Sequence, residues 1–269
     1  SDVSATPDQY LPIGNGTEGE PYQIATLDNI YWLSQNSSHW DKYYKQTANI
    51  DASATSGWDS GAGFSPIGNL STKFTGTYDG DGYTISGLYI NRPSTDYTGL
   101  FGYTNYATIK DLGVTDVDIY GGGYHIGGLA GYNNSSTMTN CYSTGSVTGS
   151  GSQYVGGLLG HTYNTSVSNS YSTCSVTGWR RVGGLVGWNH SGSTVTNCYS
   201  TGSVTGSMEW DGTQYIWVGG LVGDNTGGTV INSFWDWQTS GVWDGASGGI
   251  RISTAQMKTL STFTNAGWD

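Results

Sequence analysis

Short apolar and β-branched runs alternate with glycine- and asparagine-rich stretches along most of this chain, and the runs recur regularly. One apolar box that ends in Gly occurs five times, with the residue before its Leu at positions 99, 128, 157, 184 and 220. The segments between the boxes carry Val, Thr, Ser, Tyr and Ile without the apolar spacing of three and four typical of helices, and they predict strands. The five boxes are Thr98–Gly102, Gly127–Gly131, Gly156–Gly160, Gly183–Gly187 and Gly219–Gly223.

A repeat of this length predicts an array in which each unit buries its apolar side only against its neighbours. A propeller is the main alternative, but its repeats of roughly 40–50 residues are longer than the 27 to 29 that separate the first four boxes. The predicted fold class is therefore all-β: a parallel β-solenoid, or stacked β-arch array, with short capping segments.

Stacked coils place equivalent residues above one another at a strand spacing of about 4.8 Å. A second repeated box predicts two such columns, one of amide side chains that bond from coil to coil and one of aromatic rings. The amide column comprises Asn140, Asn169, Asn197 and Asn232, and the aromatic column comprises Tyr142, Tyr171, Tyr199 and Phe234.

The ends of the chain depart from the repeat and divide it into four parts. Residues 1–21 form an N-terminal arm, 22–63 an N-terminal cap with lead-in strands, 64–249 the repeat array, and 250–269 a C-terminal cap. After Thr26, a suitable N-cap, apolar residues at 27, 30, 31 and 33 predict a short helix that covers the first coil. The segment 254–260 predicts a second short helix at the other end.

The repeated boxes resemble the GLUG motif, Gly-Leu-hydrophobic-Gly, as in Gly184–Gly187. The segments 43–51, 64–68 and 74–85 are similar to the stretch that leads into such arrays, and 234–236 and 254–257 to their ending. The resemblance implies a surface or secreted protein of bacteria or archaea, related to adhesins and to non-catalytic regions of immunoglobulin-cleaving peptidases. The short, acidic, Tyr-rich chain also resembles the β-arch sheath protein of filamentous methanogenic archaea.

Composition narrows the range of partners. Charged residues make up 11% of the chain, with a net charge of −11 and only nine Lys and Arg, which argues against nucleic acid and anionic membranes. No apolar run approaches 18 residues, so membrane insertion is not expected. The chain starts at Ser1 without Met, as after removal of a signal peptide or at a cloning boundary. An extracellular, cell-surface location is the prediction.

The three cysteines do not form an obvious disulfide framework. Cys141 and Cys198 hold the same repeat position two coils apart, about 9.6 Å by strand spacing and beyond the ~7 Å limit for a disulfide. They are interpreted as small packing residues like Ser170. The alternative is a bridge to another subunit, through Cys174 first and Cys141 or Cys198 next.

Two further groups of residues are candidate surface sites. Four sequons follow the apolar boxes and are expected on one exposed corner, where they are candidate glycosylation sites: Asn133, Asn134, Asn164 and Asn189. Four tryptophans are a candidate ligand or contact face, with packing as the alternative: Trp179, Trp188, Trp210 and Trp217.

Residues for catalysis are scarce. The four His share no metal-ligand spacing, Arg180 and Arg181 have no aligned acidic cluster, and no catalytic, metal or cofactor site is predicted. Asp79 and Asp81 lie in a weak calcium-like stretch that lacks the closing Glu.

These observations predict a structural, non-enzymatic protein of the cell envelope. We expect it to assemble with itself, edge to edge through β-strands, into a sheath, layer or fibre. The alternative is a surface adhesin that binds glycan or host protein through its Trp-rich face. A polysaccharide-active enzyme is a third and weaker hypothesis.

Overall fold

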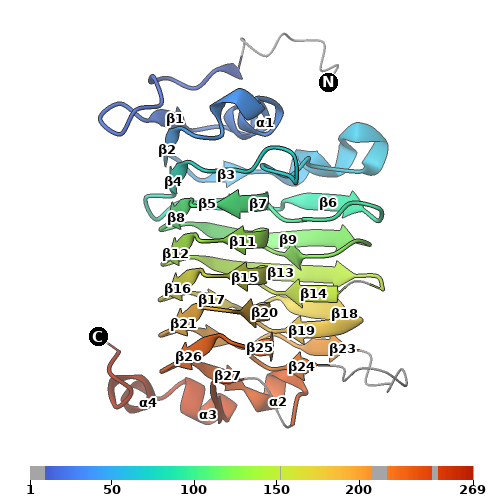
Figure 1. The fold of residues 1–269 in the computed structure, drawn as a ribbon, viewed down its shortest axis with the longest axis vertical. Helices are drawn as coiled ribbons and strands as arrows, with labels where there is room; N and C mark the ends of the chain where they lie inside the picture. Colours follow the sequence, from blue (N-terminus) through green and yellow to red (C-terminus); the bar gives the residue numbers. More distant parts are fainter. Residues whose placement is uncertain (1–9, 152, 207–216, 244–247, 269) are drawn as a thin grey trace.

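The chain winds into a parallel β-solenoid whose coils stack along the long axis of the molecule (Figure 1), as the sequence predicted. The structure is a computed structural model, and it describes residues 10–151, 153–206, 217–243 and 248–268. Every pairing between named strands is parallel and links one coil to the next. Within the described ranges no helix is both long and apolar enough to cross a membrane.

Four sheets form the walls of the solenoid, and each takes one strand or more from successive coils. The eight-stranded sheet comprises β1 (Tyr22–Ile24), β2 (Tyr43–Gln46), β4 (Thr77–Asp79), β8 (Thr108–Lys110), β12 (Thr137–Thr139), β16 (Ser166–Ser168), β21 (Thr194–Thr196) and β26 (Thr229–Ile231). The five-stranded sheet comprises β7 (Phe101–Asn105), β11 (Ala130–Asn134), β15 (Leu159–Tyr163), β20 (Val186–His190) and β25 (Val222–Asp224). The four-stranded sheet comprises β10 (Ile126–Gly127), β14 (Gln153–Gly156), β19 (Arg180–Gly183) and β24 (Val218–Gly219).

The fourth sheet has eleven strands, three of which pair outside its main strand order. Its strands are β3 (Ile50–Asp51), β5 (Thr84–Ser86), β9 (Gly113–Gly121), β13 (Tyr142–Gly149), β17 (Tyr171–Ser172), β22 (Tyr199–Ser200), β27 (Phe234–Asp236) and β28 (Ile250–Ile252), joined by β6 (Tyr89–Arg92), β18 (Ser175–Gly178) and β23 (Val204–Gly206). The strand ladders thus run from residue 22 to residue 252, beyond both ends of the predicted 64–249 array.

The core is a set of columns in which each coil contributes one apolar side chain. The clearest column follows the eight-stranded sheet, where successive registered partners are all fully buried: Ile109, Met138, Val167 and Val195. Alternation along each short strand sends the flanking Thr and Ser outward, so one buried residue per strand suffices. A thin solenoid can therefore form with only 35% hydrophobic residues.

In the last four boxes, the three glycines lie where backbones approach closely, except Gly220, which lies against the Trp235 side chain; the fourth box illustrates the backbone contacts. A Cβ on Gly183 would lie 2.0 Å from the carbonyl oxygen of Val186 in the same box, and 2.6 Å from the nitrogen of Gly223. On Gly184 it would lie 2.1 Å from the carbonyl oxygen of Gly220, one coil on. On Gly187 it would lie 2.5 Å from the carbonyl oxygen of Gly160, one coil back. The repeated motif therefore marks where backbones of successive coils touch.

Short helices lie at both ends of the solenoid (Figure 1), as predicted. Helix α1 (Leu27–Gln35) begins after Thr26, whose side chain accepts a hydrogen bond from the Asn29 backbone while the Asn29 side chain accepts one from Thr26. Its buried face packs into the first coils through Ile30, Trp32 and Leu33. At the other end lie α2 (Trp237–Ser240), α3 (Thr254–Met257) and α4 (Leu260–Thr264). The 3₁₀ turns η2 (Ser37–His39), η3 (Ser53–Gly57) and η4 (Asp59–Gly61) connect the first strands.

Candidate functional site: an aromatic and histidine stripe

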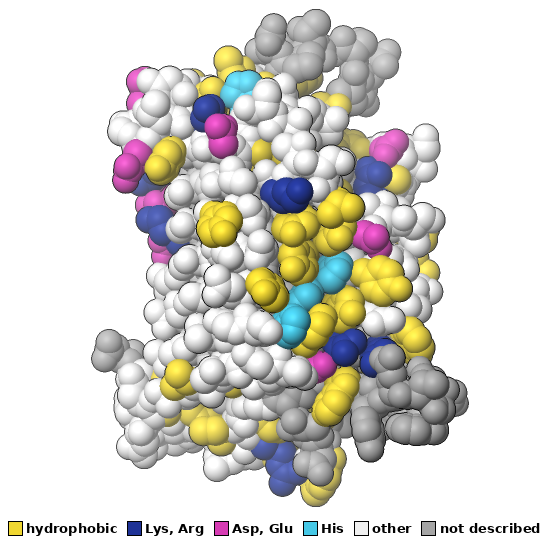
Figure 2. All heavy atoms as spheres, in the orientation of Figure 1, with side chains coloured by type: hydrophobic (Ala, Val, Ile, Leu, Met, Phe, Trp, Pro, Cys, Tyr) yellow, Lys and Arg dark blue, Asp and Glu magenta, His cyan; other side chains and the backbone are white. Residues whose placement is uncertain are grey.

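Aromatic and histidine side chains gather in a band across the face of the molecule shown in Figure 2. We call this band the stripe. It has two columns, one on the five-stranded sheet and one at the corner where the strands of the four-stranded sheet begin. The corner column comprises Tyr97, His125, Tyr154 and Arg181; the sheet column comprises Tyr103, Tyr132, His161 and Trp188.

The corner column is a stack of flat groups, each on the next coil. The Tyr97 and His125 rings lie 5.1 Å apart between centroids and 3° from parallel, and His125 and Tyr154 lie 4.7 Å apart at 16°. The guanidinium of Arg181 continues the stack 5.2 Å from the Tyr154 centroid. All four residues have a left-handed backbone, with φ between 50° and 65°, although none is glycine.

The sheet column packs edge to face and then face to face. Tyr103 meets Tyr132, and Tyr132 meets His161, at centroid distances of 4.6 Å and interplanar angles of 74° and 77°. His161 then stacks on Trp188 at 4.4 Å and 19°. Lys73 lies over Tyr103 at the other end of this column, so cations border the stripe at both ends.

Two histidines join the columns and are held neutral. The Nδ1 atoms of His125 and His161 lie 3.3 Å apart, a hydrogen bond in which one ring donates and the other accepts. Burial lowers the pKa of His125 to about 3. Burial, assisted by His125, His190 and Arg181, lowers the pKa of His161 to about 2. The Nε2 atom of His161 is buried without a hydrogen-bond partner, so this ring is packed chiefly as an apolar group.

A buried ion pair closes the C-terminal end of the stripe. Arg181 Nε donates to Asp224 Oδ2 at 2.7 Å, and the two side chains are 15% and 4% exposed. The other Asp224 oxygen accepts hydrogen bonds from Thr226, so the carboxylate is fully used. The ion pair and the two neutral histidines leave the stripe rigid and with little net charge.

Only one residue of the stripe, Trp188, was predicted as a site residue from the sequence. The signal that could have found others is register: His125, Tyr154 and Arg181 each precede an apolar box by the same two positions. Trp188 offers no open platform for a sugar, because His161, His190 and Arg181 all lie against its ring.

Trp188 is therefore not available to the Trp-rich ligand face predicted from the sequence. Trp179 lies outside both columns of the stripe. Trp217 immediately precedes β24, at the register position that follows Arg181. Trp210 lies outside the described residues.

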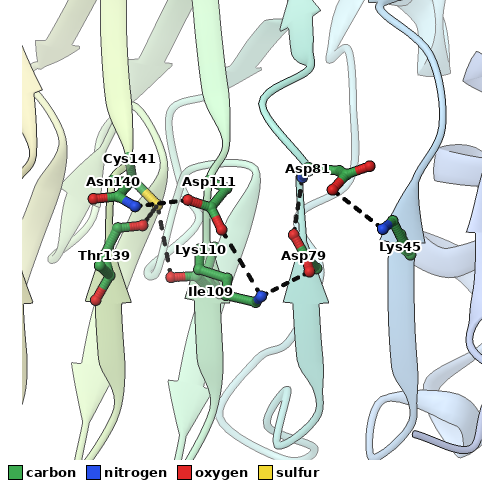
Figure 3. A network of polar contacts seen from close by, with 9 residues as sticks. All are labelled: Lys45, Asp79, Asp81, Ile109, Lys110, Asp111, Thr139, Asn140 and Cys141. Carbon is green, nitrogen blue, oxygen red and sulfur yellow. Dashed lines mark hydrogen bonds and ion pairs between the residues drawn. The ribbon is translucent and has the colours of Figure 1, made fainter. Parts of the chain in front are cut away.

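A second polar cluster occupies the corner beside the eight-stranded sheet (Figure 3). Lys110 Nζ lies 2.7 Å from Asp79, and Lys45 Nζ lies 3.1 Å from Asp81. Asp79 also accepts a hydrogen bond from the backbone of Asp81, which forms a tight turn. The calcium hypothesis is therefore not supported at this corner, since lysines already neutralise both carboxylates. Among the described residues, no group of three or more His, Cys, Asp or Glu is placed to hold a metal ion.

The cysteines are buried packing residues, which corrects the hypothesis of an inter-subunit disulfide. Cys141, Cys174 and Cys198 are free thiols with no exposed surface, so none can reach another chain in the folded protein. Burial raises the pKa of the Cys141 and Cys198 thiols to about 12. Cys141 takes its place in a column with Ser170, whose hydroxyl accepts a hydrogen bond from the Cys141 backbone at 3.0 Å.

The sequons do not share one exposed corner, contrary to the prediction. Asn133 and Asn189 are fully buried in a column with Thr104 and Thr162, and a glycan cannot be accommodated there. Asn133 accepts from the Thr104 hydroxyl at 2.9 Å, as Asn189 does from Thr162. Asn134 is half-buried and Asn164 is exposed, but they lie in different columns.

The two predicted columns on the other walls stand in register. Tyr142, Tyr171 and Tyr199 stack with centroids 4.8 Å apart and angles of 5° and 4°, and Phe234 follows Tyr199. The Asn residues likewise follow registered strand ends, at corners with φ between 46° and 54°. The expected continuous amide ladder is wrong, because Asn197 Oδ1 is buried without a partner. These asparagines are suited to the left-handed corner itself, which Asn tolerates better than most residues.

Comparison with known proteins agrees with this architecture. The GLUG motif matches residues 122–148, 151–177 and 180–205. The chain is therefore a β-solenoid that carries GLUG repeats, as the sequence resemblance indicated. It is 41% identical over 115 residues, or 40% of its length, to halomucin of Haloquadratum walsbyi. Over 92 residues, or 33% of its length, it is 44% identical to a provisionally named Gly-rich membrane protein of Evansella cellulosilytica. These matches span only 1% and 10% of the two relatives.

Solved structures show the same fold. A protein from Bacteroides ovatus, provisionally described as an immunoglobulin A1 protease, aligns with a TM-score of 0.66 and 25% identity. The alignment covers 83% of this chain and 68% of that one. A second structure, named IgA1 protease, aligns with a TM-score of 0.51 and 19% identity over 79% of this chain and 16% of its own, which shows the fold alone.

Proposed function

We propose that this chain is an extracellular structural element of the cell envelope. The observation that carries the proposal is the set of in-register ladders, from β1 to β26 in the eight-stranded sheet and from β3 to β28 in the eleven-stranded sheet, which make the chain a stiff rod held by backbone hydrogen bonds. The similarity to halomucin and to a Gly-rich membrane protein, although it covers small parts of both, supports a surface location. The resemblance to the methanogen sheath protein stays a prediction.

The finer proposal is assembly edge to edge. At the N-terminal end the edge of β1 is partly covered, since Gln23 donates its backbone N–H to the Ile13 carbonyl at 2.7 Å. At the C-terminal end the last strands of two sheets carry apolar side chains in solvent, Ile231 at 44% and Ile250 at 51% exposure. Exposed strand edges can pair with another chain. We propose that two copies meet at this C-terminal end. A sheath, layer or fibre would need a second contact elsewhere on the chain.

Substitution of Ile231 by Lys tests that contact. We expect the untagged wild-type protein to form species larger than 28.5 kDa that persist in 1 M salt, and Ile231→Lys to shift them to monomer, because a charge on the edge strand opposes pairing. Size-exclusion chromatography with light scattering measures the mass. Leu70→Lys, at a residue 61% exposed, is the matched control and should leave the mass unchanged. A wild-type protein that stays monomeric at millimolar concentration contradicts edge-to-edge assembly.

A surface adhesin is the second candidate. The stripe favours it, because Tyr124 and Tyr163 beside its two columns remain 48% and 41% exposed on a surface of low charge. Aromatic side chains with a polar tip are common where proteins meet partners. A monomer that binds glycan or host protein and loses binding with Tyr124→Ala and Tyr163→Ala is the outcome this candidate requires.

We also propose that the chain has no catalytic activity of its own. Asp79→Ala and Asp81→Ala should each lower the free energy of unfolding by no more than about 1 kcal/mol, because the carboxylates are partly exposed and their lysine pairs are screened. Chemical denaturation measures this change. Wild type and both variants should release no product from a panel of polysaccharides or from immunoglobulin A1. Hydrolysis or elimination by the wild type, lost in either variant, would show the proposal to be wrong.

A further inference from the structure

A cavity of about 600 Å³ lies at the N-terminal cap, apart from the stripe. This volume is within the range of roughly 300–1,000 Å³ typical of small-molecule sites. Helix α1, the turns η3 and η4 and strand β6 contribute its walls. The side chains that the argument uses are Tyr31, Gln35, Trp58, Asp59, Ser65 and Arg92.

A fixed ion pair forms the polar part of the cavity. Arg92 donates from Nε to the Phe64 carbonyl at 2.9 Å, and from Nη2 to the Gly63 carbonyl at 3.1 Å and to Asp59 Oδ2 at 2.9 Å. The Arg92 side chain is only 18% exposed, whereas that of Asp59 is 63% exposed. These contacts use the Nε and Nη2 groups of the guanidinium and one carboxylate oxygen. Among the described residues no contact is assigned to Nη1 or Oδ1, which makes them a donor and an acceptor for a ligand.

Two aromatic rings form the apolar part. Tyr31 on α1 and Trp58 between η3 and η4 meet at a centroid distance of 5.1 Å and an angle of 74°. Trp58 is half-buried and packs against the core near Phe64. Apolar C–H faces of sugar rings pack on aromatic side chains, whose polar edges and neighbours then bind hydroxyl groups.

The loop that carries Asp59 is held in an unusual conformation. Asp59 and Ser60 have φ values of 48° and 54°, and Gly61 and Gly63 follow at 89° and 77°. Two successive non-glycine residues in the left-handed region cost free energy and persist only where their surroundings fix them. Here the Arg92 contacts fix the loop, and the carboxylate is held in place before any ligand arrives.

We propose that this cavity is a binding site for a neutral mono- or disaccharide unit with adjacent hydroxyl groups. Asp59 accepts from one hydroxyl, Arg92 donates to its neighbour, and Trp58 with Tyr31 packs against the ring. Gln35 and Ser65 lie at the cavity wall as further hydrogen-bonding groups. An anionic ligand fits less well, because Asp59 already neutralises Arg92 and the protein carries a net charge of −11.

Isothermal titration calorimetry of the full chain tests the site. The probes are methyl glycosides of glucose, galactose and mannose with their common disaccharides, and glucuronate and inorganic phosphate serve as anionic comparators. We expect at least one neutral sugar to bind with a dissociation constant of roughly millimolar strength. Repeating the titration with a soluble polysaccharide of that sugar distinguishes recognition of a chain unit from recognition of the free sugar.

Variants at the cavity separate binding from folding. Trp58→Ala should weaken binding by at least about tenfold, through loss of the aromatic wall. Asp59→Asn should weaken it similarly while it preserves the loop, because Asn tolerates the left-handed region. Trp243→Ala, at an exposed tryptophan of the C-terminal end, is the matched control and should bind like the wild type. Circular dichroism and thermal unfolding establish that each variant is folded.

Three outcomes would overturn the proposal. They are no binding by any neutral sugar at about 50 mM, tighter binding of glucuronate or phosphate, and sugar binding that Asp59→Asn leaves unchanged. None of them bears on the structural role, since assembly is measured separately by light scattering and depends on the opposite end of the molecule.

Discussion

Replacement of Gly183 by Ala is expected to lower the free energy of unfolding by more than about 3 kcal/mol, or to prevent folding. The added Cβ would lie 2.0 Å from the carbonyl oxygen of Val186 and 2.6 Å from the nitrogen of Gly223, and both obstacles are backbone. Backbone cannot move aside as a flexible side chain can. Relief requires the box to distort within its own coil, away from Val186, and to move away from Gly223 on the next coil, which disturbs the pairing of β19 with β24.

Denaturant unfolding followed by far-ultraviolet circular dichroism measures this effect. Gly19→Ala is the matched control, because a Cβ there meets no atom within 4 Å, and its change should stay within about 0.5 kcal/mol. An equal, small loss for both variants would mean that the backbone around the box adjusts to a Cβ and that the motif has another origin.

Acidification is expected to destabilise the protein between about pH 6.5 and pH 4.5 through the histidine pair. The folded protein holds the pKa of His125 at about 3 and that of His161 at about 2, whereas an unfolded histidine titrates near 6.5. The unfolded state therefore binds more protons below pH 6.5, so the stability is complete above that pH and decreases as the pH falls. The loss reaches up to about 3 kcal/mol per histidine at pH 4.5.

The double variant His125→Gln/His161→Gln isolates this contribution. Both proteins are unfolded by denaturant at a series of pH values, and the slope of the unfolding free energy against pH is compared. The slope below about pH 6.5 should be markedly smaller in the variant, even if its stability at neutral pH is lower. The same slope in both proteins would assign the acid sensitivity to other groups, with the partly buried His190 the next to test.

Most of the fold could be predicted from the sequence repeat, because residues at equivalent positions of successive repeats stack on one another. The Gly183–Gly187 box and its copies, the Tyr142 column and the N-cap at Thr26 are each local or periodic, and each was predictable. The stripe could not be predicted, because its two columns come from two different sheets. Whether side chains of two sheets come into contact depends on the angle of the corner between them. The prediction that the sequons share one exposed corner failed for a related reason. Asn133 and Asn134 are neighbours in sequence, but they point to opposite sides of the sheet.

The N-terminal cavity was also outside the reach of sequence patterns. Trp58 and Arg92 are separated along the chain by strands β4 and β5 and belong to no motif. Their proximity follows from the pairing of β3 and β6 with their neighbours and from the loop around Asp59. Cys141 and Cys198, by contrast, are buried as the simpler hypothesis expected, because Ser170 at the equivalent position showed that a small side chain is sufficient, whereas the first choice for an inter-subunit bridge, Cys174, is buried too.

The left-handed corner gives this architecture a way to change its surface without changing its shape. Tyr97, His125, Tyr154 and Arg181 share one backbone conformation but differ in size, polarity and charge. The hydrogen-bonded strands on either side fix the conformation, so the identity of the corner side chain is left open to variation. Duplication of a coil followed by substitution at this one position would add a new chemical group at the next step along the rod. Such a protein could diversify what it displays, one coil at a time, while its scaffold stays constant.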